Sequence, residues 1–376
     1  MKILFFYCGE GLGHATRAIA AANALKDKHD ITLASYGYTR DFGINAGLDV
    51  KEVPSEIQLV GKSGQFDLSK SILTTISNSS RQPHGILKFN SLINKTKPDL
   101  VLSDSFFLPA TLAKNKGIPT WMMLNQTNIE KFFYTNSKAL IRMAGPFIKR
   151  LNHSTLSKMD KILVPDFSPP FTVCEESIKL TPELYERTQY IGPLVRNMGR
   201  ELKTKPKKKT VYCMIGGFGY RKQLLDKIVE ASRELPDYHF DLVAGPNAKL
   251  AAHGKNVKAY AQITNPLPLE NESSLVIGGG GHSTAMEALS LGKPVLAAPD
   301  AFHCEQECNA DGLERIGAGR RIDYKTSTQT LKLLIEELST SKEYKKRVTM
   351  LKHLAEKNDG RKELVRLVKE LEEEKR

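Results

Sequence analysis

A glycine turn between an apolar run and a segment suited to a helix is the feature that most constrains the fold of this chain. Residues 275–277 (Leu-Val-Ile) are apolar, residues 278–281 are glycines, and residues 282–287 (His-Ser-Thr-Ala-Met-Glu) follow. This pattern predicts a buried strand that ends in a tight turn and opens a helix. Backbone approaches a ligand closely where side chains are absent, and free N–H groups at a helix N-terminus attract anions. The turn therefore predicts a phosphate site, and the Glu287 carboxylate, about one helical turn further on, is placed to reach the hydroxyls of an attached ribose.

An acid and an amide stand side by side after the next apolar run. Glu305 and Gln306 follow residues 295–298 (Val-Leu-Ala-Ala) closely. In open α/β sheets, ligands bind in the crevice beyond the carboxyl ends of the strands. We therefore expect this pair to lie near the glycine turn, in a nucleotide-binding site. For the glycines alone, a turn that serves only helix and strand packing explains the sequence equally well.

Apolar runs and helix-like segments alternate along the chain. The first unit spans residues 1–195 and begins with a strand candidate at 3–7, and a polar, basic, proline-interrupted linker follows at 196–209. A second alternating unit spans residues 210–340, and residues 341–376 have the charge pattern of solvent-facing helices. Such alternation is typical of parallel sheets covered by helices. The predicted fold class is α/β, with two Rossmann-like parallel-sheet domains.

A second group of candidate residues follows the first strand. The run Gly9-Glu10-Gly11-Leu12-Gly13-His14 lacks the third glycine of the dinucleotide-binding fingerprint, because His14 stands in its place. A histidine at the mouth of a parallel sheet, just before the helix expected at 16–28, suits a general base. Asp104 ends the apolar run 100–103, which we expect beside the first strand, so its carboxylate is a candidate to orient the imidazole. The alternative is that each of these two side chains caps a helix.

The residues from Gly278 to Gly319 resemble the donor-binding region of GT-B nucleotide-sugar glycosyltransferases. The likeness is to the family 1 UDP-glycosyltransferases and to the family 28 cell-wall N-acetylglucosaminyltransferase that makes lipid II, and it rests on residues 287–294 (Glu-Ala-Leu-Ser-Leu-Gly-Lys-Pro) and 305–310 (Glu-Gln-Glu-Cys-Asn-Ala). It implies two domains that face each other across a cleft, with the C-terminal helices packing back on the N-terminal domain. It also implies that Glu287 contacts the ribose and that the carboxylate and amide at 305 and 306 contact the donor sugar. The residues expected around the diphosphate are Gly217, Gly280, Gly281, His282, Ser283 and Thr284.

Two motifs of the first half extend this resemblance. Residues 11–14 (Gly-Leu-Gly-His) resemble the element that carries the catalytic base of family 1 enzymes, and residues 102–107 (Leu-Ser-Asp-Ser-Phe-Phe) resemble the strand end that carries its aspartate. The implied function is inverting transfer of a hexose-type sugar from a UDP-sugar to a hydroxyl acceptor, with the histidine and aspartate as catalytic residues. Glu10 and Gly13 are the acceptor-side candidates. Two alternatives stay open: a nucleotide-sugar 2-epimerase, and a non-catalytic subunit that binds a sugar nucleotide or a polyanion.

We expect neither a metal ion nor a cofactor beside the nucleotide sugar. The chain contains no Asp-x-Asp triplet, the motif with which glycosyltransferases of the other main architecture hold a divalent ion. Helix N-termini can stabilise a leaving diphosphate in its place. The five cysteines are scattered, which predicts free thiols. Cys304 and Cys308, together with His303, allow a zinc interpretation, but their spacing favours a structural role.

Positive charge is concentrated before residue 210. The net charge is +13, and the linker 196–209 alone carries seven Lys or Arg against one Glu. Residues 132–151 combine large apolar with basic side chains, as in an ordinary half-buried helix or in a surface that binds an anionic membrane. A lipid-linked or other glycan precursor is the acceptor class considered, and no specific nucleic-acid partner is expected. Since no long apolar run occurs, the expected location is cytoplasmic, with peripheral contact at the inner face of the membrane as the alternative.

Overall fold

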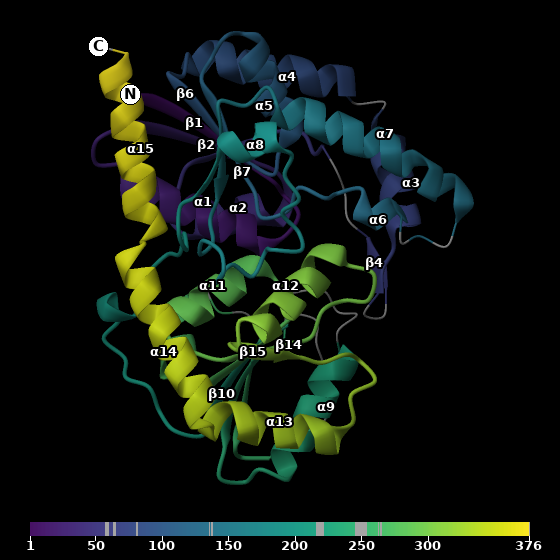
Figure 1. Ribbon diagram of the computed structural model, residues 1–376, viewed down its shortest axis with the longest axis vertical. Helices are drawn as coiled ribbons and strands as arrows, with labels where there is room; N and C mark the ends of the chain where they lie inside the picture. Colours follow the sequence, from purple (N-terminus) through teal and green to yellow (C-terminus); the bar gives the residue numbers. More distant parts are fainter. Residues whose placement is uncertain are drawn as a thin grey trace.

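The computed structural model describes residues 1–56, 60–62, 65–79, 82–134, 136, 138–215, 222–244, 254–261, 263 and 265–375. Figure 1 shows two α/β domains, one above the other, with the N-terminal domain in purple to teal and the C-terminal domain in green to yellow. Each domain has its own sheet with helices packed around it.

The N-terminal domain contains a seven-stranded sheet in the order β3-β2-β1-β6-β7-β8-β9, and all pairings are parallel. Its strands are β1 (Lys2–Tyr7), β2 (Asp30–Ser35), β3 (Val50–Glu52), β6 (Leu100–Asp104), β7 (Thr120–Met123), β8 (Lys161–Val164) and β9 (Thr188–Tyr190). A separate antiparallel pair is formed by β4 (Gly61–Lys62) and β5 (Gln65–Phe66). Its helices are α1 (Leu12–Leu25), α2 (Gly37–Asn45), α3 (Leu68–Ser79), α4 (Gln82–Thr96), α5 (Phe107–Asn115), α6 (Lys131–Tyr134), α7 (Ala139–Leu156) and α8 (Pro182–Glu186).

The C-terminal domain contains a six-stranded parallel sheet in the order β12-β11-β10-β13-β14-β15. Its strands are β10 (Thr210–Met214), β11 (His239–Val243), β12 (Val257–Tyr260), β13 (Leu275–Gly278), β14 (Val295–Ala297) and β15 (Gly319–Arg321). A short 3-10 helix, η1 (Gly199–Glu201), precedes it. The helices are α9 (Lys222–Arg233), α10 (Leu267–Glu272), α11 (His282–Ser290), α12 (Cys304–Arg315), α13 (Thr328–Thr340), α14 (Lys342–Lys357) and α15 (Gly360–Glu374).

The candidate residues lie at or just after the carboxyl ends of strands in the two sheets. β1 is buried along its length except at Lys2, as expected for a parallel strand covered on both faces. At the carboxyl ends, Tyr7 pairs with Asp104 in the N-terminal sheet and Met214 pairs with Gly278 in the C-terminal sheet. The loops that carry ligand-binding side chains therefore leave neighbouring strands at the same edge of each sheet.

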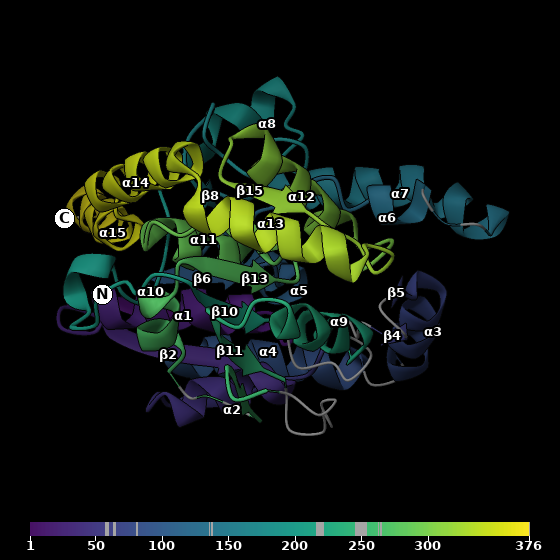
Figure 2. The same ribbon diagram turned by 90° about the horizontal axis from the view of Figure 1, so that it is seen from below.

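The last two helices span both domains. α14 packs on α11 of the C-terminal domain, whereas α15 packs on α1 of the N-terminal domain. Leu364, Leu367 and Val368 of α15 are buried in the same apolar cluster as the alanines of α1. In Figures 1 and 2 the two helices lie along one side of the molecule, and α15 is the one beside the N-terminus. The C-terminal helices therefore join the core of the domain that begins the chain.

The predicted fold class is confirmed by the two parallel sheets with their helices. The start of α1 differs from the expectation, since the helix begins at Leu12 and not at Thr16. Gly11, with φ of 105°, is the N-cap residue, so the helix starts directly after the turn and His14 lies inside its first turn. Within the described ranges, no helix combines the length and the apolar character that crossing a membrane requires.

Candidate active site

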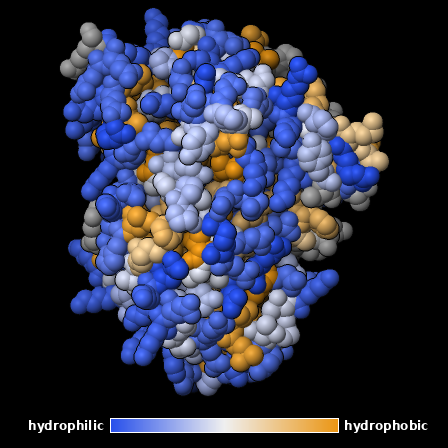
Figure 3. All heavy atoms as spheres, in the orientation of Figure 1, coloured by the Kyte–Doolittle hydropathy of each residue, from blue (hydrophilic) through white to orange (hydrophobic). Residues whose placement is uncertain are grey.

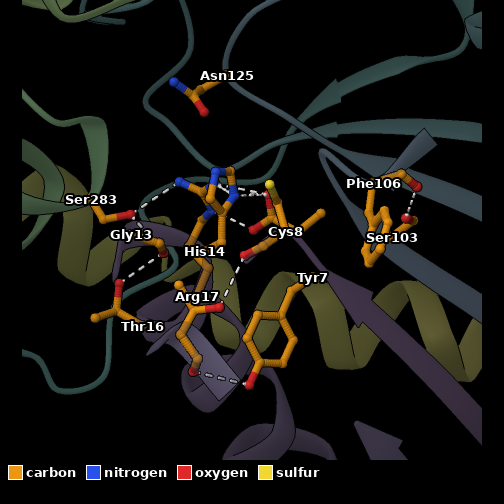
Figure 4. A network of polar contacts seen from close by, with 12 residues as sticks. Tyr7, Cys8, Gly13, His14, Thr16, Arg17, Ser103, Phe106, Asn125 and Ser283 are labelled. Atoms are coloured by element: carbon orange, nitrogen blue, oxygen red, sulfur yellow. Dashed lines mark hydrogen bonds and ion pairs between the residues drawn. The ribbon is translucent and has the colours of Figure 1, made fainter. Parts of the chain in front are cut away.

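His14, Asp104 and Arg17 form a compact polar cluster at the carboxyl end of the N-terminal sheet. His14 Nδ1 lies 2.8 Å from Asp104 Oδ1. Arg17 donates from Nε to Asp104 Oδ2 over 2.7 Å and from Nη2 to Oδ1 over 2.8 Å. Figure 4 shows the His14 and Arg17 side chains at the centre of this network. The structure thus brings together the two residues expected to form a dyad and adds a cation to them.

The Asp104 carboxylate is held in its charged form. Its side chain is fully buried, and burial alone would raise the pKa of Asp104, but the charge of Arg17 and then that of His14 outweigh burial and hold this pKa well below its usual range. Asp104 does not cap the helix that follows it, because the first N–H groups of α5 donate to Glu56 over 2.8 and 3.0 Å. The capping interpretation of Asp104 is therefore wrong.

Ser283 of the C-terminal domain touches this cluster. Its Oγ accepts a hydrogen bond from Arg17 Nη1 over 3.0 Å and donates to the carbonyl oxygen of Gly13 over 3.0 Å. A Cβ atom at Gly13 would lie 2.8 Å from Ser283 Oγ, so glycine is required for this close approach. The two domains are therefore in direct contact beside the His14 and Asp104 pair.

The glycine turn forms the opposite wall. Gly280 has φ of 74°, and a Cβ atom there would lie 2.8 Å from the backbone oxygen of Gln306, which explains why the position is glycine. Gly281 is the N-cap residue of α11 and has no side chain to offer a cap. The first turn of α11 lines the cleft with Ser283 and Thr284. This geometry meets the requirements of an anion site at a helix N-terminus.

Glu287 is engaged in a buried ion pair. Arg196 donates to its two carboxylate oxygens over 2.8 and 3.1 Å, and Glu287 is only 3% exposed. Glu270 of α10 is 1% exposed, and within the described part of the chain neither of its carboxyl oxygens has a hydrogen-bond partner. Burial, followed by the charge of Glu287, raises the pKa of Glu270 well above its usual range. Arg196 therefore neutralises Glu287, while Glu270 stays protonated beside it.

Glu305 and Gln306 lie at the start of α12, beside the glycine turn. Glu305 Oε1 accepts a hydrogen bond over 2.8 Å from Asn125 Nδ2 of the N-terminal domain. Burial opposes ionisation of Glu305, but the charge of His303 and the Asn125 hydrogen bond outweigh it and lower its pKa. Gln306 Oε1 accepts from the Asp300 N–H over 2.9 Å. Both side chains line the cleft, and the backbone of Gln306 lies against Gly280, so the acid and amide pair lies near the glycine turn, as expected.

The imidazole of His282 lies in the domain interface. It is 2% exposed, with Nε2 3.4 Å from Asp166 Oδ2, and Cys174 completes a group of potential metal ligands, the one found in the described ranges. However, Asp166 Oδ2 already accepts hydrogen bonds from the Thr172 hydroxyl and the Val173 and Cys174 N–H groups. The carboxylate is thus saturated, and we do not assign a metal to it. At position 282, the backbone N–H is the group available to an anion.

The remaining sequence expectations concern α12 and a second glycine turn. Cys304 and Cys308 are buried free thiols, and His303 accepts the Gln306 N–H at the start of α12. These three side chains do not form a metal-ligand group in the part of the chain that the structure describes. Gly217 lies outside the described residues.

One cleft of about 1810 Å³ is lined by His14, Arg17, Ser283, Glu287, Glu305 and Gln306, among other residues. The wall opposite the glycine turn is largely apolar and comes from α5, α6, α7 and their flanking loops, with Leu108, Ile129, Phe132, Phe133, Ile141 and Ile148 among its residues. The acids that the N-terminal domain contributes to the cleft, among the described residues, are Glu10, Asp41 and Glu56. Burial raises the pKa of Glu56 to about 7, although its two backbone hydrogen bonds act in the opposite direction. The wall therefore suits a ligand with an apolar body and few charges.

Two arginines of the site were not predicted from the sequence. Arg17 stands three residues after His14 in α1, a spacing that places both side chains on one helix face, so a signal for it was present. In the sequence, Arg196 is one of the seven basic residues of the linker 196–209, and nothing there marks it as a site residue. Its partner Glu287 is 91 residues away, and no local pattern connects the two.

Family models match both halves of the chain. Residues 1–195 match the model described as Glycosyl transferase family 1, and residues 227–364 match the Glycosyltransferase family 28 C-terminal domain. An uncharacterized glycosyltransferase of Methanosarcina mazei is 40% identical over 365 residues, which cover 96% of each chain. The UDP-N-acetylglucosamine--N-acetylmuramyl-(pentapeptide) pyrophosphoryl-undecaprenol N-acetylglucosamine transferase of Clostridioides difficile is 26% identical over 358 residues, covering 87% of this chain and 78% of that protein.

Solved structures show the same fold. The spinosyn forosaminyltransferase superposes with a TM-score of 0.72 at 16% identity and 99% coverage of both chains. A spinosyn rhamnosyltransferase complexed with thymidine diphosphate superposes with a TM-score of 0.65 at 19% identity, covering 94% of this chain and 95% of that one. Two-domain glycosyltransferases thus share the arrangement of sheets around the cleft.

Proposed function

The chain belongs to the GT-B glycosyltransferases related to families 1 and 28, and from this premise we propose that it transfers a hexose-type sugar from a UDP-sugar to a hydroxyl acceptor with inversion and without a metal ion. The observation that carries the proposal is that His14, paired with Asp104, lines the same cleft as the start of α11, whose Ser283 contacts Gly13. The base and the diphosphate site then belong to one cleft, in which we place the sugar.

His14 acts as the general base. Its Nδ1 is engaged by Asp104 at 2.8 Å, and the ring lines the cleft, so Nε2 is the atom that takes the acceptor proton. The acceptor oxygen bonds to the anomeric carbon while the bond from that carbon to the phosphate oxygen breaks, and the nucleoside diphosphate leaves with the electron pair. A base positioned in this way contributes roughly 10²- to 10⁴-fold to the rate. Attack from the face opposite the leaving group inverts the anomeric carbon.

The leaving diphosphate is stabilised by the protein itself. The backbone N–H groups at the N-terminus of α11 after Gly281, with the hydroxyl of Thr284, supply fixed donors for the developing charge. Treatment with a chelator is therefore expected to leave the turnover rate unchanged. Loss of turnover that only an added divalent ion restores would contradict this part of the proposal.

Donor recognition is assigned to Glu287, Glu305 and Gln306. Glu287 contacts the ribose, and the other two contact the sugar hydroxyls, with Asn125 holding Glu305 from the N-terminal domain. The Clostridioides difficile relative is named as a transferase that uses UDP-N-acetylglucosamine, which supports uracil as the base. The thymidine diphosphate in the rhamnosyltransferase complex supports the class of ligand, a nucleoside diphosphate.

A lipid-linked acceptor at an anionic membrane fits the apolar wall. α7 contributes Ile141 and Ile148 to the cleft and exposes Leu140, Met143 and Phe147, which are 80%, 76% and 67% exposed. In Figure 3, pale orange atoms gather at the right-hand edge, where Figure 1 places the projecting end of α7. Basic residues, Arg142, Lys149 and Arg150, flank these apolar side chains. An apolar stripe with adjacent cations is the combination that binds the surface of an anionic bilayer, and the enzyme would then work at the cytoplasmic face.

A screen of nucleotide sugars tests the function. Thermal shift identifies the donor that raises Tm most, and nucleotide release is then measured with that donor, with and without hydroxyl acceptors carrying an apolar chain. Acceptor-dependent release supports the proposal. Conversion of the free nucleotide sugar into its 2-epimer without an acceptor, or binding without any release, would replace it by one of the two alternative functions.

A further inference from the structure

Glu56 occupies the N-terminus of α5, on the side of the cleft that the N-terminal domain forms. Its two carboxylate oxygens accept hydrogen bonds from the backbone N–H groups of Phe107 and Leu108 over 2.8 and 3.0 Å. All three residues line the cleft, and the N-cap residue of α5, Phe106, makes no side-chain capping hydrogen bond. Free N–H groups at a helix N-terminus bind anions such as phosphate. At α5, this position is therefore already filled by a carboxylate of the protein.

Two other helices, α11 and α1, begin beside each other at the proposed diphosphate site. α11 starts after Gly281, and the hydroxyl of its Ser283 donates to the carbonyl oxygen of Gly13 in the first turn of α1. The N–H of Gly11, just before α1, donates to the Tyr38 hydroxyl over 2.6 Å. These two N-termini therefore belong to the donor side, whereas the N-terminus of α5 lies on the apolar wall proposed for the acceptor.

The charged side chains of the acceptor side are mostly acids. Glu10, Asp41 and Glu56 line the cleft from the N-terminal domain. Among the described residues of this domain, Arg17 is the one Lys or Arg that lines the cleft, and its donors are in use. Its Nε and Nη2 donate to Asp104, and its Nη1 donates to Ser283. An anionic group on the acceptor would therefore meet like charge, which costs free energy at short range.

We propose that Glu56 determines acceptor specificity, admitting an uncharged apolar alcohol and rejecting an acceptor that carries a phosphate beside its hydroxyl. The inference rests on the proposed transfer to a hydroxyl acceptor and names the class of that acceptor. Each Glu56 oxygen keeps a lone pair beyond its backbone hydrogen bond, so a hydroxyl group of the acceptor can donate to it. The apolar body of the acceptor then lies along the wall that includes Ile129 and Phe133.

Two soluble probes that differ by one phosphodiester test this proposal. 1-Octylglycerol and octylphosphoglycerol both end in a pair of hydroxyls, and only the second carries a negative charge. Calorimetric titration at pH 8 measures the affinity of the protein for each probe, above the pKa of Glu56, which burial raises to about 7. We expect the wild type to bind the uncharged probe about 10- to 100-fold more tightly, because the other probe brings a like charge to the carboxylate.

Two variants of Glu56 separate its charge from its size. Glu56→Ala empties the N-terminus of α5, and Glu56→Gln removes the charge at nearly constant size. In both variants we expect the preference for 1-octylglycerol to fall to about threefold or less, because octylphosphoglycerol no longer meets the carboxylate. Glu52→Ala is the matched control, because it removes the same charge from an exposed position of β3 and should keep the wild-type preference. Should the alanine variant fail to fold, the glutamine variant decides.

The titrations can contradict the proposal in several ways. Equal affinity of the wild type for the two probes, tighter binding of octylphosphoglycerol, or no binding of 1-octylglycerol would overturn it. An unchanged preference in a folded Glu56 variant would overturn it as well. The titrations need neither donor nor turnover. Failure of the proposed function would therefore show separately, as the absence of nucleotide release by a wild type that still prefers the uncharged probe.

Discussion

The two walls of the cleft are built in different ways. The donor wall consists of backbone in a glycine turn, the first turn of α11 and one buried ion pair between Arg196 and Glu287. The acceptor wall consists of large apolar side chains on α6 and α7, some of which also face solvent. A diphosphate is an anion, so backbone N–H groups at a helix N-terminus suffice for it. The proposed acceptor has an apolar body, and the wall assigned to it is made of apolar side chains.

The strongest test of this division is the base on the acceptor side. His14→Ala is expected to lower kcat by roughly 10²- to 10⁴-fold, because the acceptor hydroxyl loses its proton acceptor. Donor affinity, measured by calorimetric titration with the nucleoside diphosphate, should stay within about threefold of wild type, since His14 belongs to the other domain and is not among the groups assigned to the diphosphate. If donor affinity fell as much as kcat does, His14 would contribute to donor binding, and the assignment of separate walls to donor and acceptor would be wrong.

Removing the charge of Glu287 tests the donor wall. Glu287→Gln is expected to weaken donor binding roughly 10- to 100-fold, because hydrogen bonds to a charged group are worth about 1.5–3 kcal/mol. It should also lower the free energy of unfolding by about 3 kcal/mol, because Arg196 is left as a buried unpaired cation. The double variant Arg196→Met with Glu287→Gln should regain stability but not donor affinity. Normal donor binding in that double variant would exclude the ribose contact.

The acceptor wall is tested at the membrane. Changing Arg142 and Lys149 to Gln is expected to weaken binding to vesicles that contain anionic lipid, and so to reduce co-flotation. The expected loss of binding free energy is about 2 kcal/mol, because each charge near the surface contributes about 1 kcal/mol. Phe147→Ser should reduce it further through lost apolar contact. Lys205→Gln with Lys208→Gln is the control, because it removes the same charge from the exposed linker. Equal flotation of all variants would rule out α7 as the membrane contact.

The smallest expected effect concerns Glu56. Its pKa rises from 4.5 to about 7 on folding, so the folded state holds this proton more tightly than the unfolded state. The corresponding stability is present below pH 4.5 and is lost as pH rises through 7. Glu56→Gln cannot titrate, so the Tm of the wild type should fall relative to that of the variant between pH 5 and 8. Parallel Tm profiles would show that Glu56 does not hold the proton.

The sequence allowed the fold and the pairing of His14 with Asp104 to be predicted for one physical reason. Parallel strands that are buried on both faces are apolar along their length, and their carboxyl ends meet at one edge. Tyr7 pairs with Asp104 in the sheet, so a residue that follows β1 and a residue that ends β6 become neighbours. The same rule placed the acid and amide pair of α12 beside the glycine turn.

The side-chain partners were not predictable from local patterns. Arg17 is shared between Asp104 and Ser283, at sequence separations of 87 and 266 residues, and Arg196 is 91 residues from Glu287. Glu56, and not Asp104, satisfies the N-terminus of α5, at separations of 51 and 52 residues. Such contacts depend on the relative position of distant elements, which spacing along the chain does not encode.

The anomeric configuration of the product tests the central claim most directly. With the donor and an acceptor identified as above, proton NMR of the first product formed reports whether the new glycosidic bond has the configuration of the donor or its opposite. A single displacement, in which His14 activates the acceptor on the face of the sugar opposite the departing diphosphate, predicts inversion at every turnover. A product with retained configuration would contradict that arrangement.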